Sequence, residues 1–324
     1  MKQKRILFAV KSVAYALAAL GLLFAALFAT SSQFRASIPG YLTVIDRYYL
    51  LMANRKSDLR TGFVWYGKVR KIIEPVSFTE QCIISAREPG LVQWRSPIGT
   101  FWLPEAEGIS SLIDMASVIQ QDIYTYEGRG IRPGDIVLDC GAHVGSFTRK
   151  ALNKGASLVV AIEPSPVKVT CLQKNFDGEI VAGRVRVLQV GIWSHDDKLW
   201  LEGVSDVGNS VVSGPTPAGV GPGEWVQVTT LDKLVEEQRL GKVDFIKMDI
   251  EGAECEALQG ACGTIVKFRP FLAIGTEHTE NWAQNARNVI AVVEQCGGNY
   301  RLGFGRYGHR GRMPYAPMEV FFYQ

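Results

Sequence analysis

The sequence predicts an α/β fold built around a mostly parallel β-sheet. From residue 134 onward, short apolar runs alternate with segments of helical pattern, which is typical of a sheet that helices cover on both faces. Two further runs, at 198–202 and 225–230, predict a separate hairpin. The main sheet is expected to have seven strands, the last two as a closing hairpin, at 136–138, 158–162, 185–190, 243–248, 271–274, 300–304 and 319–323.

Length and charge limit the kinds of protein that fit. A chain of 324 residues suits one large domain, expected at 119–324, preceded by a basic start with an anchor at 1–30 and a lead-in region at 31–118. The formal net charge is +3, and the chain has no long basic run, so no nucleic-acid partner is expected. The six cysteines lack metal-site spacing, and we predict free, buried thiols in a reducing compartment. The oligomeric state stays open.

The amino terminus has the features of a membrane anchor. Residues 12–30 carry no charged side chain and follow four basic residues within the first eleven positions. A helix of this length crosses the hydrocarbon core of a bilayer, whereas a cleaved signal peptide needs a shorter apolar run. We therefore predict a single-pass membrane protein. Five basic residues within 35–60 nearly balance the near flank, so charge does not fix the orientation.

The lead-in region has a mixed pattern. Aromatic and basic residues over 31–60 suit a helix lying at the membrane interface, and an ordinary packed helix explains them equally well. Over 63–130, short apolar runs are broken by several prolines. We expect a small, strand-rich structure there.

The segment 139–145, DCGAHVG, carries the clearest ligand-binding pattern. It follows the first expected strand and opens a helix expected at 146–153. Glycines let the backbone come close to a ligand. The middle glycine of the dinucleotide fingerprint is absent, which favours a nucleoside without a pyrophosphate, although a tight turn that binds nothing is the structural alternative. The candidate cofactor-binding residues here are Asp139, Gly141, Ala142, His143 and Gly145.

The next two strands end in further cofactor candidates. Glu163 closes the second strand, where an acidic side chain accepts hydrogen bonds from both ribose hydroxyls, and Pro164 follows it. Gln189 and Gly191 close the third strand, where an adenine ring would lie. Gln189 is equally well explained as an exposed polar strand end.

A second cluster, KMDIEGAE at 247–254, follows the fourth strand. Asp249 is expected beside the first strand, where the strand order switches, and can bind a cationic group of the cofactor or face the substrate. Glu251 and Glu254 bracket a helix start, and the helix dipole favours acids there without any function. For Glu254 we prefer this structural explanation.

Four stretches of the sequence belong together: GDIVLDCGAHVG (134–145), IEPSP (162–166), TTLDKL (229–234) and VDFIKMDIEGAECEALQGA (243–261). They resemble the motifs of the FkbM family of methyltransferases, and the resemblance covers about residues 120–300. The resemblance implies a Rossmann-like, seven-stranded class I methyltransferase sheet, S-adenosyl-L-methionine as the methyl donor, and O-methylation of a sugar or another hydroxylated metabolite. The Gly141–Gly145 turn, Glu163 and Asp249 match the family's motifs, while His143 stands where many relatives have Asn. Because the donor is made in the cytosol, a cytoplasmic catalytic domain is expected.

An alcohol acceptor must lose its proton to a base. The candidate catalytic residues are Asp249, Glu251 and His278, and an ordinary histidine pKa near 6.5 would suit a base at neutral pH. Asp249, Glu251 and Glu277 could hold Mg²⁺, but no spacing demands it, so no metal is predicted. The acceptor is expected to be a small molecule or a glycan, and the anchor at 12–30 suggests a lipid-linked one. Its pocket is expected to be formed by 124–127 and 203–223.

Two other functions compete with methyl transfer. An NAD(P)-linked oxidoreductase also has a glycine turn followed by an acidic strand end, although the missing middle glycine argues against it. A catalytically inactive, methyltransferase-like membrane adaptor would keep the fold without the chemistry. Intact acids at 163 and 249 argue against the adaptor.

Overall fold

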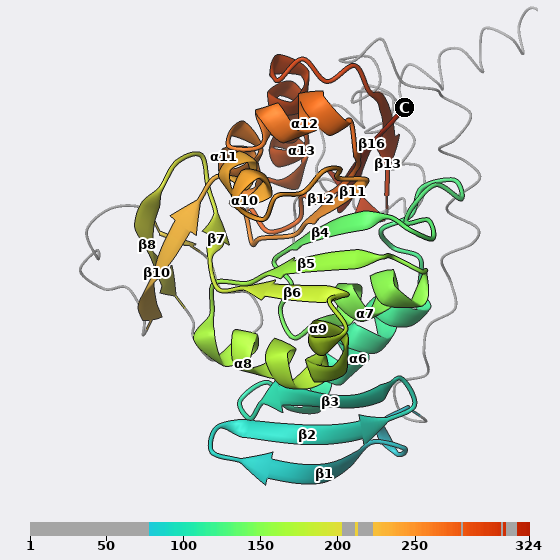
Figure 1. The fold of residues 1–324 in the computed structure, drawn as a ribbon. Helices are drawn as coiled ribbons and strands as arrows, with labels where there is room; N and C mark the ends of the chain where they lie inside the picture. Colours follow the sequence, from blue (N-terminus) through green and yellow to red (C-terminus); the bar gives the residue numbers. More distant parts are fainter. Residues whose placement is uncertain (1–77, 203–210, 213–222, 280, 306, 309–315) are drawn as a thin grey trace, which may run out of the picture.

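The computed structural model describes residues 78–202, 211–212, 223–279, 281–305, 307–308 and 316–324 (Figure 1). The anchor predicted at residues 12–30 lies outside the described residues, as does the interfacial helix expected over 31–60. Within the described part of the chain, no helix combines the length and the apolar character that a membrane crossing requires.

The centre of the molecule is the expected seven-stranded sheet, with the strand order β13-β16-β12-β11-β4-β5-β6. Neighbouring strands from β12 to β6 are parallel, and β16 runs antiparallel to both β12 and β13, so the closing hairpin pair is confirmed. The strands are β4 (Ile136–Cys140), β5 (Leu158–Ile162), β6 (Val185–Leu188), β11 (Phe245–Met248), β12 (Phe271–Gly275), β13 (Arg301–Phe304) and β16 (Glu319–Tyr323).

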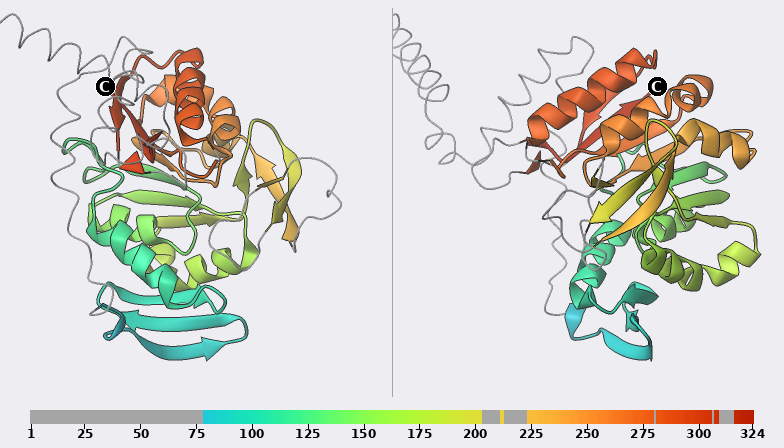
Figure 2. Two further views of the ribbon diagram at one scale, coloured as in Figure 1. Left: turned by 180° about the vertical axis from the view of Figure 1, so that it is seen from behind. Right: turned by 90° about the vertical axis from the view of Figure 1, so that its left-hand side faces the viewer.

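Helices cover both faces of this sheet (Figures 1 and 2). Successive strand residues point to opposite faces. Val137 and Val159 accordingly pack with Phe147 and Leu172 on one side, whereas Leu138 packs into the core on the other. The first side has α7 (Ser146–Asn153), α8 (Pro166–Asn175) and α9 (Asp177–Val181), and the second has α10 (Leu231–Glu237), α11 (Glu254–Gln259), α12 (Cys262–Phe268) and α13 (Trp282–Gln295).

The strand order reverses next to β4. The chain runs from β4 outward through β5 to β6, and later returns to place β11 on the other side of β4. The loops at the carboxyl ends of β4 and β11 therefore diverge and leave a crevice between them. This topology fixes where a ligand can bind.

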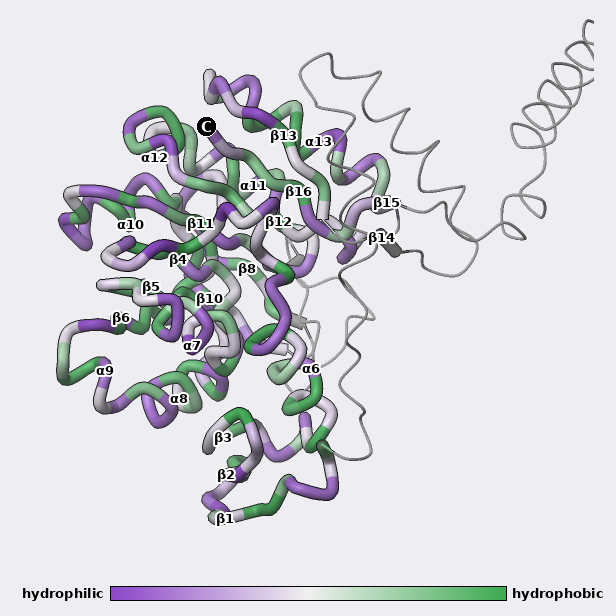
Figure 3. The backbone as a smooth tube through the Cα atoms, turned by 90° about the vertical axis from the view of Figure 1, so that its right-hand side faces the viewer, coloured by the Kyte–Doolittle hydropathy of each residue, from purple (hydrophilic) through white to green (hydrophobic). Residues whose placement is uncertain are grey.

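The described part of the lead-in region is strand-rich, as predicted. Three antiparallel strands, β1 (Ile83–Glu88), β2 (Leu91–Ser96) and β3 (Gly99–Pro104), form a separate sheet. A helix that the sequence analysis did not predict, α6 (Gly108–Gln120), connects this sheet to the main domain. Its apolar residues lie between β3 and the main domain (Figure 3), where they pack with residues of β3 and α8.

A second small sheet extends the molecule beyond β6 at the carboxyl ends of the strands (Figure 1). The expected hairpin is confirmed, because β8 and β10 pair antiparallel. The strands β14 (Tyr307–Gly308) and β15 (Ala316–Pro317) form a separate two-stranded sheet. The small sheet has the order β7-β10-β8-β9, with β7 (Gly191–Ile192), β10 (Gly223–Thr229), β8 (Asp197–Glu202) and β9 (Val211–Val212).

The prediction that the cysteines are all free thiols is wrong. Cys262 and Cys296 form a disulfide that joins the first residue of α12 to the residue after α13. The two positions are 34 residues apart in the sequence and carry no recognisable motif, so only the packing of the two helices brings them together. The remaining cysteines are free.

Candidate active site

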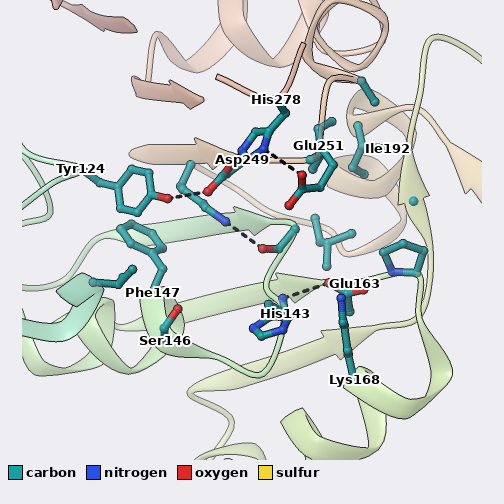
Figure 4. Close-up of a pocket in the computed structure, with 18 of the residues that line it drawn as sticks. Tyr124, His143, Ser146, Phe147, Glu163, Lys168, Ile192, Asp249, Glu251 and His278 are labelled. Carbon is teal, nitrogen blue, oxygen red and sulfur yellow. Dashed lines mark hydrogen bonds and ion pairs between the residues drawn. The ribbon is translucent and has the colours of Figure 1, made fainter. Parts of the chain in front are cut away.

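A cavity of about 500 Å³ opens at the carboxyl ends of β4, β5 and β11 (Figure 4). This volume lies within the usual range for small-molecule sites, roughly 300–1,000 Å³. Of the predicted site residues, those that line it are Gly141, His143, Glu163, Pro164, Gly191, Asp249, Glu251 and His278, whereas Asp139, Ala142, Gly145 and Gln189 do not. The structure therefore brings most of the predicted site together at the place where the strand order reverses.

The glycine turn is shaped by packing inside the protein. A Cβ atom on Gly141 would lie 2.1 Å from the carbonyl oxygen of Asp249, and one on Gly145 would lie 2.1 Å from the ring of Phe176. Both glycines also have a positive φ, which side chains disfavour. Gly141 thus lets the end of β4 lie directly against the end of β11. The close approach of the two strand ends therefore requires a glycine at this position even in the absence of a ligand.

Buried charged side chains hold the backbone of the glycine turn in place. The Lys247 ammonium donates hydrogen bonds to the carbonyl oxygens of Gly141 (2.8 Å) and Cys140 (3.3 Å) and lies 3.3 Å from the Asp139 carboxylate. Burial alone would lower the pKa of Lys247, but the charges of Asp139 and Asp249 raise it further than burial lowers it. Asp139 also accepts a hydrogen bond from Thr148 (2.7 Å) and is fully buried. Asp139 therefore supports the turn and does not face the cavity.

Glu163 is held in place by backbone groups. Its carboxylate accepts hydrogen bonds from the backbone N–H of His143 (2.9 Å) and of Ser165 (3.1 Å). A carboxylate has about four acceptor positions, so two donors leave capacity for further hydrogen bonds. Glu163 is 6% exposed and lines the cavity. It can therefore accept hydrogen bonds from a pair of ligand hydroxyls in a fixed direction.

The wall beyond Glu163 is apolar. Val190, Gly191 and Ile192 continue the cavity from the end of β6, and the small sheet adds Leu201 and Val228. Gln189 is exposed and lies outside the wall, and Ala142 is buried in the core with Phe147 and Leu172. The sequence analysis found the hairpin that supplies Leu201 and Val228 but assigned it no part in the site. An apolar wall of this kind suits a flat aromatic ring.

The opposite part of the cavity is charged. Asp249 accepts hydrogen bonds from the Tyr124 hydroxyl and from His278 Nε2, both at 2.6 Å, and His278 Nδ1 lies 2.8 Å from Glu251 (Figure 4). Burial by itself would raise the pKa of the Asp249 carboxyl. The positive charge of Lys247 and the hydrogen bonds from His278 and Tyr124 outweigh burial and hold that pKa well below its usual range.

His278 differs from the base that the sequence analysis expected. Burial alone would lower its pKa, but hydrogen bonds to Asp249 and Glu251, and the charges of both, raise the pKa to about 11. The ring is therefore a cation at neutral pH, and both nitrogens donate to carboxylates. No lone pair is left to accept a proton, so His278 organises the two acids in this arrangement.

The structure adds two residues to this part of the site. Tyr124, which the sequence analysis named only within 124–127, contacts Asp249 directly. Glu277, considered there only as a metal ligand, lines the cavity, and burial together with the charges of Asp249 and Glu319 raises its pKa to about 8. The residue type and the strand-end position of Glu277 could have flagged it. Nothing in the sequence links Tyr124 to Asp249.

Glu254 has a structural role at the start of α11. Glu254 is fully buried as the first residue of α11, and its carboxylate accepts hydrogen bonds from the N–H groups of Ile250 and Gly252. This agrees with the structural explanation preferred above. Among the residues that the structure describes, no group of three or more His, Cys, Asp or Glu side chains is placed to hold a metal ion.

The sequence of this chain is similar to that of known methyltransferases. A family model described as the methyltransferase FkbM domain matches residues 139–300. The 31-O-demethyl-FK506 methyltransferase FkbM of Streptomyces tacrolimicus is 43% identical over 63 residues, which is 19% of this chain and 24% of that protein. The matched stretch thus spans about a quarter of the curated relative.

Among solved structures, the methyltransferase FkbM from Methylobacillus flagellatus KT aligns with a TM-score of 0.44 and 22% identity, over 61% of this chain and 47% of the other. The O-methyltransferase from Bacillus cereus, in complex with SAH, aligns with a TM-score of 0.36 and 12% identity, over 58% and 74% of the two chains.

Proposed function

The chain belongs to the FkbM methyltransferase family, and from this premise we propose that it transfers the methyl group of S-adenosyl-L-methionine to a hydroxyl group of a small-molecule or glycan acceptor. The observation that carries the proposal is the position of Glu163. Its carboxylate, oriented by two backbone N–H groups, lines the same cavity as Gly141 at the edge where open α/β sheets bind nucleosides.

The residues present fit such a cofactor. Glu163 would accept hydrogen bonds from the ribose hydroxyls, and the apolar wall of Val190, Ile192 and Val228 would contact the adenine. Asp249, whose lowered pKa keeps it ionised, would bind the ammonium group of the methionine part. A bound S-adenosyl-L-methionine would supply a reactive methyl group on its sulfonium.

The protein's own chemistry then consists of orienting the acceptor and receiving its proton. His278 is unavailable as a base because both of its nitrogens donate. Among the described residues, Glu277 makes no ion pair, and its pKa of about 8 matches a base that works near neutral pH. We assign the proton-accepting role to Glu277, with Asp249 and Glu251 orienting the acceptor through their remaining acceptor positions.

The acceptor class follows from the lining. Carboxylates, a tyrosine, Lys247 and His278 line this end of the cavity and offer both hydrogen-bond acceptors and donors, so hydroxyl groups are favoured there. The predicted anchor at residues 12–30 favours a lipid-linked acceptor, with the catalytic domain on the cytoplasmic face.

Ligand titration tests the cofactor. Calorimetry of the purified protein with S-adenosylhomocysteine and, separately, with NADH should give binding of the first only. Glu163→Ala should weaken that binding by about tenfold or more, because hydrogen bonds to a charged group contribute roughly 1.5–3 kcal/mol. The matched control, Glu105→Ala, removes an exposed acid outside the cavity and should bind normally. Binding of NADH alone would favour the oxidoreductase.

Methyl transfer itself needs a second assay. Lipid and soluble extracts incubated with protein and labelled S-adenosyl-L-methionine should yield a labelled product, which mass spectrometry can identify. Asp249→Ala and Glu163→Ala should abolish labelling. Tight cofactor binding without labelling in any fraction would favour the inactive adaptor.

A further inference from the structure

A buried lysine on the same side of the cavity as Glu163 has no obvious structural purpose. Lys168 is the third residue of α8 and is only 5% exposed, yet it lines the cavity. In Figure 4 its side chain rises from α8 toward Glu163 and His143. A cation in the first turn of a helix opposes the helix dipole, and a buried cation needs partners. Both facts make Lys168 costly in the unbound protein.

The partners available to Lys168 are too few. Its ammonium has three hydrogen-bond donors. Among the described residues it makes one charged contact, with Glu107, whose Oε1 lies 4.0 Å away, and no hydrogen bond within the usual distance. At least two of its donors therefore have no acceptor among the described residues, and Lys168 lines the cavity.

Glu107 comes from the lead-in region and is already engaged. Its buried carboxylate accepts hydrogen bonds from His143 Nε2 and from the Ser111 hydroxyl, each at 2.9 Å. Burial alone would raise the pKa of Glu107, but the hydrogen bond from His143 and the charges of His143 and Lys168 lower it overall. Glu107 therefore keeps a negative charge behind Lys168 and His143, which holds the lysine at this side of the cavity.

We infer that the Lys168 ammonium donates a hydrogen bond to the nucleoside part of the bound cofactor, to a ribose oxygen or a ring nitrogen, next to the hydroxyls that Glu163 accepts. The inference rests on the proposed function, since it needs an adenosyl ligand in this cavity. Glu163 and Lys168 would then bind the hydrogen-bond donors and the hydrogen-bond acceptors of the nucleoside, respectively. The residue itself lies outside the set that the sequence analysis selected.

The test compares Lys168→Met with Lys174→Met. Lys174 lies on the same helix, outside the cavity, and pairs with Glu88 on the surface. Calorimetry should show that Lys168→Met weakens binding of S-adenosylhomocysteine by about tenfold or more, as expected for a lost hydrogen bond to a charged group. Adenosine should lose the same factor, because the contact is to the nucleoside. Lys174→Met should bind both ligands as the wild type does.

Thermal unfolding supplies a readout that a merely structural lysine would not give. Without ligand, Lys168→Met should melt at or above the wild-type temperature, because the buried cation that it removes has one weak charged contact among the described residues, at 4.0 Å from Glu107, and Glu107 keeps its hydrogen bonds from His143 and Ser111. A variant that melts lower and also binds weakly would overturn the inference, as would binding within about twofold of wild type, or a loss seen with S-adenosylhomocysteine and not with adenosine. If the wild type binds neither ligand, the proposed function fails first and this inference falls with it.

Discussion

The two halves of the cavity are built by different forces. The half around Gly141 and Glu163 is set by close backbone contacts and by backbone N–H donors. The half around Asp249, His278 and Glu251 is set by ionised side chains that hold one another in place. The comparison teaches that the first half should be sensitive to added volume and the second half to lost charge and to pH.

The largest effect is expected at the turn. Gly141→Ala should lower the free energy of unfolding by about 3–4 kcal/mol. The added Cβ atom would overlap the Asp249 carbonyl oxygen, and the alanine would have to keep the positive φ of Gly141. Gly134→Ala is the matched control, since Gly134 also has a positive φ but open space around it, and should cost only about 1–2 kcal/mol. Urea unfolding measures both. Equal costs would mean that the contact with Asp249 does not matter.

A smaller but still large effect is expected from removing the central charge. Asp249→Asn should cost about 3 kcal/mol, because Lys247 and His278 would lose a buried anionic partner. Asp114→Asn removes an exposed acid from the same cavity lining and should change stability by less than about 0.5 kcal/mol. Chemical denaturation of both variants decides the matter. A similar cost for the two would show that Asp249 is not the centre of the network.

The tyrosine should contribute less than the charge that it contacts. Tyr124→Phe removes the hydroxyl that donates to Asp249 and should cost about 1.5 kcal/mol. In Tyr300→Phe the lost hydroxyl is buried and has no hydrogen-bond partner among the described residues, so that variant should be neutral or slightly stabilised. If the two substitutions have the same effect on thermal stability, the contact between Tyr124 and Asp249 is not stabilising.

The smallest effect is a dependence on pH. The folded-state pKa of His278, about 11, lies above the ordinary value of 6.5, so its stabilisation is complete below about pH 6.5 and is lost as the pH rises toward 11. One pKa unit corresponds to about 1.4 kcal/mol. Wild type should therefore lose at least about 1 kcal/mol between about pH 7 and about pH 10 that His278→Asn does not lose. Parallel unfolding curves for the two proteins would contradict a charged His278.

The sequence analysis predicted the central sheet because buried parallel strands are continuous apolar runs. The strand at 158–162 and the helix at 146–153 have the predicted bounds, and the third strand ends two residues earlier than expected. The helix α6 was missed because the short apolar runs between prolines at 63–130 are typical of strands. The disulfide between Cys262 and Cys296 was missed because no local pattern marks it.

The candidate site divides in the same way. Gly141, Glu163 and Asp249 could be selected because each directly follows or closes a strand, and strand ends at the switch point converge in space. Glu107 and Lys168 could not be paired, since one belongs to the lead-in region and the other to α8. The base expected at His278 was drawn from an ordinary pKa, and that value changes once two carboxylates lie against the ring.

The strands, the glycine turn and the acids at the strand ends could be predicted from the amino-acid order alone, because apolar periodicity and residue type act over a few neighbouring positions. Which charged side chains lie close together depends on the tertiary structure. A pKa, a hydrogen bond from Tyr124 to Asp249 or a buried contact between Lys168 and Glu107 depends on distances of a few ångströms between residues far apart in the chain. Electrostatic energy falls with distance and with exposure to water, so it is set by the fold and not by the order of the residues.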